Sequence, residues 1–190
     1  MGKPPPRIVD TPCGMLNAIG LENVGLAAFV KEKLPFLRRL DTPIFVNIYG
    51  KSTKEYAELA ARLEDIDGVS GIEVNISCPN VKSGGMALGA YPESAAEVVR
   101  AIRKQTAKPL MVKLSPNVTD ITEIAKSVET EGADSISLIN TLVHPNFRIF
   151  RMCLNPNQSV VGDYTISNSS FRILITADSV PGVIMDLKSS

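Results

Sequence analysis

Strand-like apolar segments alternate with helix-like segments along residues 43–141, and this alternation restricts the folds that the chain can adopt. The strand-like segments begin near residues 44, 71, 109 and 135, so the steps between them are 27, 38 and 26 residues. Each step is close to the roughly 30 residues that one βαβ unit requires. The spacing therefore predicts a parallel sheet with helices packed outside it.

The predicted elements have the residue types that strands and helices prefer. The four predicted strands are PIFVNIYG (43–50), GIEVNISC (71–78), PLMVKLS (109–115) and SISLINT (135–141). The predicted helices are KSTKEYAELAARLEDIDG (51–68), PESAAEVVRAIRKQT (92–106) and DITEIAKSVETEGA (120–133). Ser52 or Thr53 is expected to cap the first helix, which has Glu55 in its first turn, and Gly132 to end the third. Apolar faces are predicted at Ala95, Val98, Val99 and Ile102 of the second helix and at Ile121, Ile124, Ala125 and Val128 of the third.

Two α/β architectures fit this pattern, a doubly wound sheet and a β/α barrel, and periodicity alone does not choose between them. The glycine fingerprint of a dinucleotide-binding fold is missing after every predicted strand, which favours the barrel. A complete barrel has eight strands and takes roughly 250 residues. The chain has 190 residues, and about four units are recognisable, so the predicted fold is a partial TIM-type β/α barrel.

Composition and charge exclude several classes of function. Lys plus Arg and Asp plus Glu both total 20, the formal net charge is +0, and no basic stretch is dense enough for a nucleic-acid partner. The apolar runs are too short for a membrane span, and MGKPPPRIVDTP has no apolar signal-peptide core, so a cytoplasmic protein is expected. Three widely spaced cysteines predict neither a disulfide framework nor a metal site, and His144 is the single histidine, which disfavours a Ser-His-Asp arrangement.

Polar residues gather at the ends of all four predicted strands, where the chemistry of both architectures is found. They are Asn47, then Asn75, Ser77 and Cys78, then Lys113 and Ser115, and finally Asn140 and Thr141. Each has a plain structural alternative: an ion pair of Lys113 with Glu73, loop closure by an asparagine amide, or a small buried apolar role for Cys78. Convergence at four strand ends favours a functional site.

Four segments resemble one enzyme family. They are NISCPNVKSGG (75–85), MLNAIGLEN (15–23), VKLSPNVTDI (112–121) and SLINT (137–141). Together they resemble the catalytic subunit of the class 1 dihydroorotate dehydrogenases, most closely the NAD-dependent type B, over about residues 5–142. The pyrimidine-reducing domain of dihydropyrimidine dehydrogenase is similar as well, but Asn80 and the LNAIGLEN segment fit the dihydroorotate enzymes better.

This resemblance implies a β/α barrel that holds FMN at the carboxyl ends of its strands and oxidises dihydroorotate to orotate in pyrimidine synthesis. Cys78 matches the active-site base of the family, and a thiol can be tuned toward neutral pH for proton abstraction beside a carbonyl. Pro79, Gly84 and Gly85 fit a loop that closes over substrate. The resemblance also implies that electrons leave the flavin through a separate iron–sulfur and FAD subunit toward NAD.

The family's site residues carry over to matching positions of this sequence. Those that match substrate contacts are Asn17, Ala18, Ile19, Gly20, Leu21, Asn75, Asn140 and Thr141. Those that match flavin contacts are Asn47, Asn75, Lys113 and Ile139. In this arrangement Lys113 would stabilise the negative charge of the reduced flavin. No metal ligand is implied.

The sequence also departs from the family. The lysine that usually contacts substrate and flavin, with its preceding serine, has no counterpart, and the glycine-rich strands that hold the FMN phosphate are absent. The resemblance ends near residue 142, which predicts a partial barrel over 1–142 and an irregular tail over 143–190. Within the tail only FRILITA and GVIMDL look like strands, which we expect at an open edge of the sheet.

Three explanations account for the tail: a divergent ending, a shifted reading frame or truncated gene, or a missing half that another chain supplies. The abrupt loss of local consistency favours the second. The functional alternative to an active enzyme is a catalytically incompetent half-barrel. Open sheet edges would make such a half-barrel associate with other chains, so a homo- or hetero-oligomer is expected.

Overall fold

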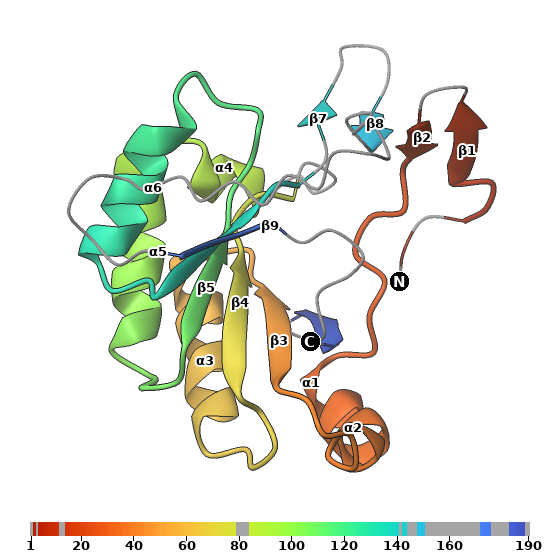
Figure 1. Ribbon diagram of the computed structural model, residues 1–190, viewed down its shortest axis with the longest axis vertical. Coiled ribbons are helices and arrows are strands. Elements are labelled where there is room, and N and C mark those ends of the chain that lie inside the picture. The colour runs from red at the N-terminus through yellow and green to blue at the C-terminus, as the bar shows by residue number, and fades with distance from the viewer. Residues whose placement is uncertain are drawn as a thin grey trace.

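A parallel sheet forms the centre of the fold (Figure 1). The computed structural model describes residues 2, 4–11, 14–78, 84–140, 142–143, 148–150, 172–175 and 183–188. In the described residues the larger sheet has six strands in the order β10-β3-β4-β5-β6-β9. Its strands are β3 (Ile44–Tyr49), β4 (Gly71–Asn75), β5 (Leu110–Lys113), β6 (Ser135–Leu138), β9 (Arg172–Ile175) and β10 (Val183–Lys188).

All pairings in this sheet are parallel, which confirms the predicted arrangement of the first four strands. β4 ends at Asn75 and β6 at Leu138, three residues earlier than predicted in both cases, because the apolar Ile76 and Ile139 continue the strand-like pattern after the backbone has left the sheet. The two strand-like runs of the tail also form strands. β9 pairs with β6 and β10 pairs with β3, so the tail adds a strand at each edge.

Three helices follow the central strands, and their ends are set by local hydrogen bonds. α3 (Thr53–Glu64) is capped by Ser52, whose Oγ accepts a hydrogen bond from the Glu55 amide at 3.3 Å. α5 (Pro92–Arg103) has proline in its first turn, and α6 (Ile121–Thr130) is capped by the Asp120 carboxylate. Beyond α6, Gly132 adopts a φ of 97°, which glycine tolerates and which ends the helix as predicted.

The order of strands and the placement of helices distinguish the two candidate architectures. β3, β4, β5 and β6 are neighbours in sequence order, and α3, α5 and α6 lie together on one side of the sheet (Figure 1). A doubly wound sheet would reverse its strand order and carry helices on both faces. The fold is therefore a partial TIM-type β/α barrel, as predicted.

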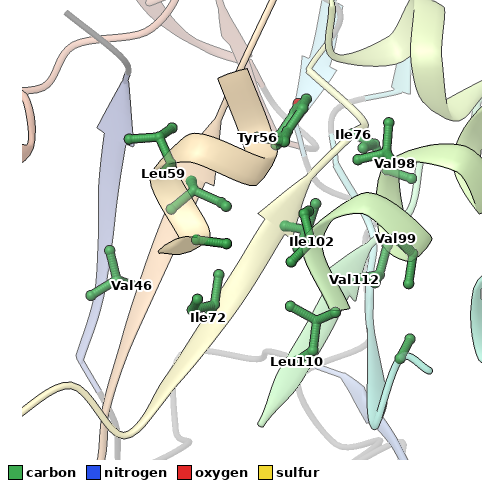
Figure 2. Close-up of a cluster of buried hydrophobic side chains, with 14 of the residues drawn as sticks. Val46, Tyr56, Leu59, Ile72, Ile76, Val98, Val99, Ile102, Leu110 and Val112 are labelled. Carbon is green, nitrogen blue, oxygen red and sulfur yellow. The ribbon is translucent and has the colours of Figure 1, made fainter. Parts of the chain in front are cut away.

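The hydrophobic core lies between the helices and the sheet (Figure 2). Val46, Ile72 and Val112 come from neighbouring strands and meet Leu59 of α3 and Ile102 of α5, and all five side chains are at most 1% exposed. Burying one such side chain contributes about 1.5–3 kcal/mol. The predicted apolar faces of α5 and α6 join this core, except that Ile121 is only partly buried.

Several short elements were not predicted. A helical segment consists of α1 (Leu26–Ala28), a π-helical turn η1 (Phe29–Lys33) and α2 (Leu34–Leu37), and a further turn, α4 (Met86–Gly89), precedes α5. A second, antiparallel sheet has the order β1-β2-β8-β7. Its strands are β1 (Ile8–Thr11), β2 (Gly14–Asn17), β7 (Leu142–Val143) and β8 (Arg148–Phe150). No helix in the described ranges has both the length and the apolar character that crossing a membrane would need.

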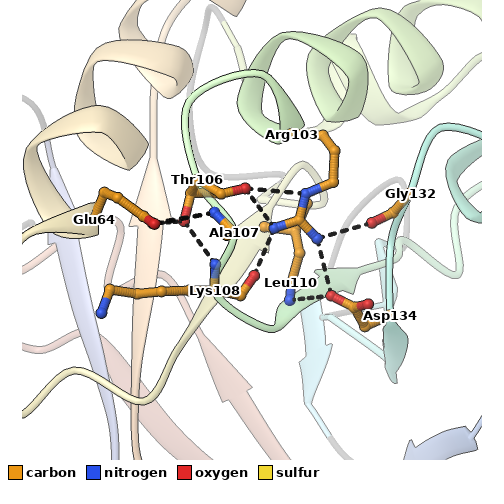
Figure 3. A network of polar contacts seen from close by, with 8 residues as sticks. All are labelled: Glu64, Arg103, Thr106, Ala107, Lys108, Leu110, Gly132 and Asp134. Carbon is orange, nitrogen blue, oxygen red and sulfur yellow. Dashed lines mark hydrogen bonds and ion pairs between the residues drawn. The ribbon is translucent and has the colours of Figure 1, made fainter.

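A network of hydrogen bonds and an ion pair joins α5 to the amino-terminal end of the larger sheet (Figure 3). Arg103, at the end of α5, donates hydrogen bonds to the carbonyl oxygens of Thr106, Lys108 and Gly132 and pairs with Asp134 at 3.0 Å. The Asp134 carboxylate also accepts a hydrogen bond from the Leu110 amide at 2.8 Å. One guanidinium thus links the end of α5 to the segments that lead into β5 and β6.

Replacing Arg103 by methionine should lower the free energy of unfolding by about 2 kcal/mol, because three carbonyl oxygens and one carboxylate lose a charged donor. Urea unfolding would measure the change. Arg62→Met on the exposed side of α3 is the control and should change stability by less than about 0.5 kcal/mol. Equal losses in both variants would contradict a special role for Arg103.

Candidate functional site

Side-chain alternation separates the two faces of the central strands. Ile72 and Val74 of β4 point into the helix-side core, so Glu73 and Asn75 lie on the opposite face, which is the inner face of the partial barrel. In the sheet register Asn47 is paired with Glu73, and Lys113 with Asn75. The inner face is therefore polar toward the carboxyl ends of the strands.

Asn75 is the centre of a hydrogen-bonded cluster at these strand ends. Its Nδ2 donates to Asn47 Oδ1 at 3.5 Å, and its Oδ1 accepts from Asn140 Nδ2 at 3.3 Å. Ser77 adds its backbone N–H and its hydroxyl, which both donate to Asn75 Oδ1 at 3.3 and 3.2 Å. Asn140 Nδ2 also donates to Ser77 Oγ at 2.9 Å. Three strand ends are joined in this way, and we call Asn47, Asn75, Ser77 and Asn140 the amide cluster.

Glu73 and Lys113 lie beside the amide cluster, and they differ in burial and in hydrogen bonding. Glu73 is fully buried and accepts hydrogen bonds from Asn47 Nδ2 and, at 2.6 Å, from Ser137 Oγ. Lys113 is partly buried, and although its backbone is paired in the sheet, its ammonium group makes no hydrogen bond or ion pair within the part of the chain that the structure describes. The ion pair between Lys113 and Glu73 that was the structural alternative is therefore not formed. The Lys113 ammonium group remains available to an anion or a polar ligand.

Cys78 lies directly after the amide cluster in sequence and is buried, with 6% of its surface exposed. It packs with Leu21 and Tyr49 in a small apolar cluster of its own. Its carbonyl oxygen accepts a hydrogen bond from the Met86 amide at 3.2 Å, which brings the start of α4 back to the end of β4. Burial of this kind suits a small apolar residue and also a base that works away from water.

Two tyrosines support the cluster from behind. The Tyr56 hydroxyl donates to the Asn75 carbonyl oxygen at 2.6 Å, and the rings of Tyr49 and Tyr56 meet edge to face at 6.3 Å. Burial, with smaller effects from the charges of Cys78 and Glu55, raises the pKa of Tyr49 to about 12. Burial also raises the pKa of Tyr56. Both phenols are therefore neutral at pH 7, and the Tyr56 hydroxyl serves as a donor.

The structure brings together some of the predicted site residues. Asn47 and Asn140 are each hydrogen-bonded to Asn75, Lys113 is next to Asn75 in the sheet, and Leu21 packs with Cys78. Ile139, which follows β6, is 38% exposed.

Other predicted residues are not joined to the amide cluster by hydrogen bonds of the described chain. Asn17 ends β2 in the smaller sheet, and the Ala18 amide donates to the Arg7 carbonyl oxygen at 2.8 Å. Ile19 and Gly20 continue this segment toward Leu21. Thr141 lies outside the described residues, as do Pro79, Asn80, Cys13 and Cys153.

Sequence reasoning missed Ser137, Tyr49 and Tyr56 as parts of this region. Ser137 could have been found from alternation, because Ser135 and Ser137 alternate along β6 with the apolar Ile136 and Leu138. Tyr49 and Tyr56 gave no such signal, since aromatic residues at a strand end and in a helix usually belong to the core. Across the described ranges, no three His, Cys, Asp or Glu side chains lie together in a way that could hold a metal ion.

Comparisons with known proteins show the family to which the chain belongs. A family model described as dihydroorotate dehydrogenase matches residues 1–162. Proteins named "Dihydroorotate dehydrogenase B (NAD(+)), catalytic subunit" from Citrifermentans bemidjiense, Geobacter sp. strain M21 and Geotalea daltonii are each 60% identical over 141 residues. The aligned part is 74% of this chain and 46% of each relative, so the chain spans about half the length of these curated relatives.

Gly84→Ala should destabilise the protein more than Gly25→Ala. Both glycines have positive φ, 71° and 77°, so both variants incur a backbone cost of about 1 kcal/mol. A Cβ at Gly84 would also overlap the Gly50 carbonyl oxygen, whereas a Cβ at Gly25 would meet nothing within 4 Å. Urea unfolding measures stability, and hydrogen exchange at the Met86 amide reports on the chain after Cys78. Equal effects of the two variants would refute this close packing.

Tyr49 should make stability depend on alkaline pH. Its pKa is raised in the folded protein from 10.0 to about 12, so its contribution is complete below pH 10 and is lost as the pH rises toward 12. The free energy of unfolding should therefore fall over this window, and the fall should be smaller in Tyr49→Phe. Unfolding in urea at a series of pH values measures this. Identical pH profiles for the two proteins would mean that Tyr49 has an ordinary pKa.

Proposed function

Because the chain belongs to the dihydroorotate dehydrogenase family, we propose that it oxidises dihydroorotate to orotate with FMN as electron acceptor, a reaction of pyrimidine synthesis. The observation that carries this proposal is the convergence of Asn47, Asn75 and Asn140 at one end of a parallel sheet, beside the buried Cys78. Active sites of β/α barrels are formed at this end of the strands.

The amide cluster is chemically suited to the substrate. Dihydroorotate is a cyclic imide that offers N–H donors and carbonyl acceptors along its ring, and a side-chain amide can both donate and accept hydrogen bonds. We propose that Asn75 and Asn140 bind this ring from below, together with Thr141. Asn17, Ala18, Ile19, Gly20 and Leu21 are proposed to complete the substrate site, and the contact of Leu21 with Cys78 supports a position for this segment over the thiol.

The residues present also fit a flavin. A flavin ring needs hydrogen-bonding groups along its pyrimidine edge and gains from a cation near that edge. Lys113 supplies an ammonium group that has no partner among the described residues, and Asn47 and Asn75 supply amides beside it. Ile139, partly exposed at the end of β6, is the proposed apolar contact for the ring. Bound FMN would supply the acceptor for the hydrogen that leaves the substrate with its electron pair.

Cys78 is the proposed base. Oxidation of dihydroorotate removes two hydrogens from adjacent ring carbons, one of them as a proton from the carbon beside a carbonyl group. The Cys78 thiolate would take this proton, and the electron pair of the broken C–H bond would form the ring double bond. Tyr49 and Leu21 pack around the thiol and exclude water from it, which keeps the proton transfer directed at the substrate.

A partner subunit is part of the proposal. The similar proteins are named as catalytic subunits of an NAD(+)-dependent enzyme, and such a name implies a second subunit in those proteins. We propose that an electron-transfer subunit with an iron–sulfur centre and FAD accepts the electrons from this chain and passes them to NAD.

Activity of the purified chain with added FMN tests the proposal, with dihydroorotate-dependent reduction of an artificial acceptor as the signal. Cys78→Ala should lower the rate about 100-fold or more, because general base catalysis contributes at least that factor. Cys13→Ala, which keeps the proposed base, should retain the rate. FMN binding is measured separately by quenching of flavin fluorescence.

Two results would count against the proposal. Equal activity of the Cys78→Ala protein and the unchanged chain would remove Cys78 as the base. A folded chain that binds neither FMN nor orotate would favour the alternative of a catalytically incompetent half-barrel.

A further inference from the structure

Glu73 is a fully buried carboxylate on the inner face of the sheet, and the proposed chemistry gives it no direct part. Its two hydrogen bonds come from neutral donors, Asn47 Nδ2 and Ser137 Oγ, and the described residues provide it with no ion pair. A buried charge is tolerated only when hydrogen bonds stabilise it. Each neighbour must therefore direct a donor toward Glu73.

This requirement fixes the direction of the Asn47 amide. Glu73 Oε2 accepts a hydrogen bond from Asn47, so Asn47 presents its Nδ2, the donor edge of its amide, to Glu73. Its Oδ1 then faces Asn75 Nδ2, at 3.5 Å. With the amide turned over, the Asn47 oxygen would face the carboxylate and its nitrogen would face another nitrogen, so both contacts would be repulsive.

The same direction continues through Asn75. Its Oδ1 faces the Ser77 backbone N–H at 3.3 Å, which can only donate, and also accepts from Asn140 Nδ2. Its Nδ2 depends on Asn47 Oδ1 for a partner. Hydrogen bonds therefore run in one direction, with Asn140 donating to Asn75, Asn75 to Asn47, and Asn47 to Glu73.

We infer that Glu73 is a positioning residue that fixes which edge of the Asn47 and Asn75 amides donates and which accepts. The inference rests on the proposed function, because these amides are the proposed contacts of FMN and of the pyrimidine ring. An amide that turns over exchanges a donor for an acceptor at the same place. A ligand with a fixed pattern of N–H and C=O groups is then no longer matched.

Two substitutions at Glu73 distinguish the role of its carboxylate as a hydrogen-bond acceptor from the space that its side chain fills. Glu73→Met fills similar space and removes the acceptor for Asn47. Glu73→Gln keeps an oxygen for Asn47, and its amide nitrogen can donate to Ser137 Oγ, so it is the conservative variant. Thr106→Val is the matched control, because it also removes a hydrogen bond to a glutamate, Glu64, but at the opposite end of the sheet.

The first measurement uses the ligand-free protein. The side-chain amide signals of Asn47 and Asn75 in proton–nitrogen NMR spectra should move in Glu73→Met, and their hydrogens should exchange at least about tenfold faster because a hydrogen-bond partner is lost. The signals should stay in place in Glu73→Gln and Thr106→Val. Unchanged Asn47 and Asn75 signals in Glu73→Met would overturn the inference, whatever the protein binds.

The second measurement is the affinity for orotate and for FMN by titration calorimetry. Glu73→Met should bind both about tenfold more weakly, whereas Glu73→Gln and Thr106→Val should stay within about threefold of the unchanged chain. Equal weakening in Glu73→Met and Thr106→Val would show a merely structural role and overturn the inference. If the unchanged chain binds neither ligand, the proposed function fails, and the NMR result still decides the role of Glu73.

A second pair of variants applies if Glu73→Met does not fold. Asn47→Asp places two carboxylates against each other and should disturb the Asn75 and Asn140 amide signals. Combining it with Glu73→Gln restores a donor opposite the new carboxylate and leaves an oxygen facing Asn75. The double variant should therefore recover those signals, and failure to recover them would overturn the inference.

Discussion

Alternation along β4 is the constraint on which the rest of this structure depends. β4 is paired on both sides, so its side chains can only point to the helices or to the inner face. Ile72 and Val74 fill the helix-side core, and Glu73 and Asn75 are consequently placed inside. A slip of one residue in the register would bury Glu73 among apolar side chains and expose Val74 to the polar face. The apolar core and the polar site thus fix the same register.

The two ends of the sheet use polar groups in different ways. At the amino-terminal end, Arg103 satisfies carbonyl oxygens and pairs with the half-exposed Asp134, which is a structural use of charge near solvent. At the carboxyl end, the amide cluster is neutral and mostly buried, and the one anion beside it, Glu73, is held by Asn47 and a serine. Neutral amides cost less to bury than charges, and the cation at this end, Lys113, is next to Asn75 in the sheet and only partly buried.

Much of the fold followed from the sequence because the relevant signals are local. Strand spacing, helix caps and apolar faces predicted the four central strands and three main helices, and Ser52 and Gly132 act as expected. The ends of β4 and β6 were placed too late, because Ile76 is apolar and continues the pattern after the backbone has left the sheet. The smaller sheet and the segment from α1 to α2 were missed. The β2–β8 pairing joins residues far apart in sequence, whereas the β1–β2 hairpin and the segment from α1 to α2 are local.

Only part of the candidate site could be predicted from the sequence. The approach of Asn47, Asn75 and Asn140 follows from parallel pairing, which places the ends of successive strands together. Alternation along β6 could have pointed to Ser137, but its hydrogen bond to Glu73, like that of Tyr56 to the Asn75 carbonyl oxygen, depends on three-dimensional contacts and could not be predicted. For Lys113 the sequence predicted a flavin contact and allowed an ion pair with Glu73 as the alternative; the ion pair is not formed, and Glu73 accepts hydrogen bonds from Asn47 and Ser137 instead.

The sheet order shows whether the amide cluster depends on the strands at the two edges of the sheet. In the described residues β10 and β9 lie at opposite edges and do not pair with each other, so the sheet is open. Every member of the amide cluster, and Lys113 as well, comes from β3, β4, β5 or β6 or from the residues that follow them. These four strands are paired consecutively, the helix-side core packs against one face of all of them, and the Arg103 network joins the amino-terminal ends of β5 and β6. The geometry of the amide cluster is therefore set by these units themselves and does not depend on which strands cover the two edges.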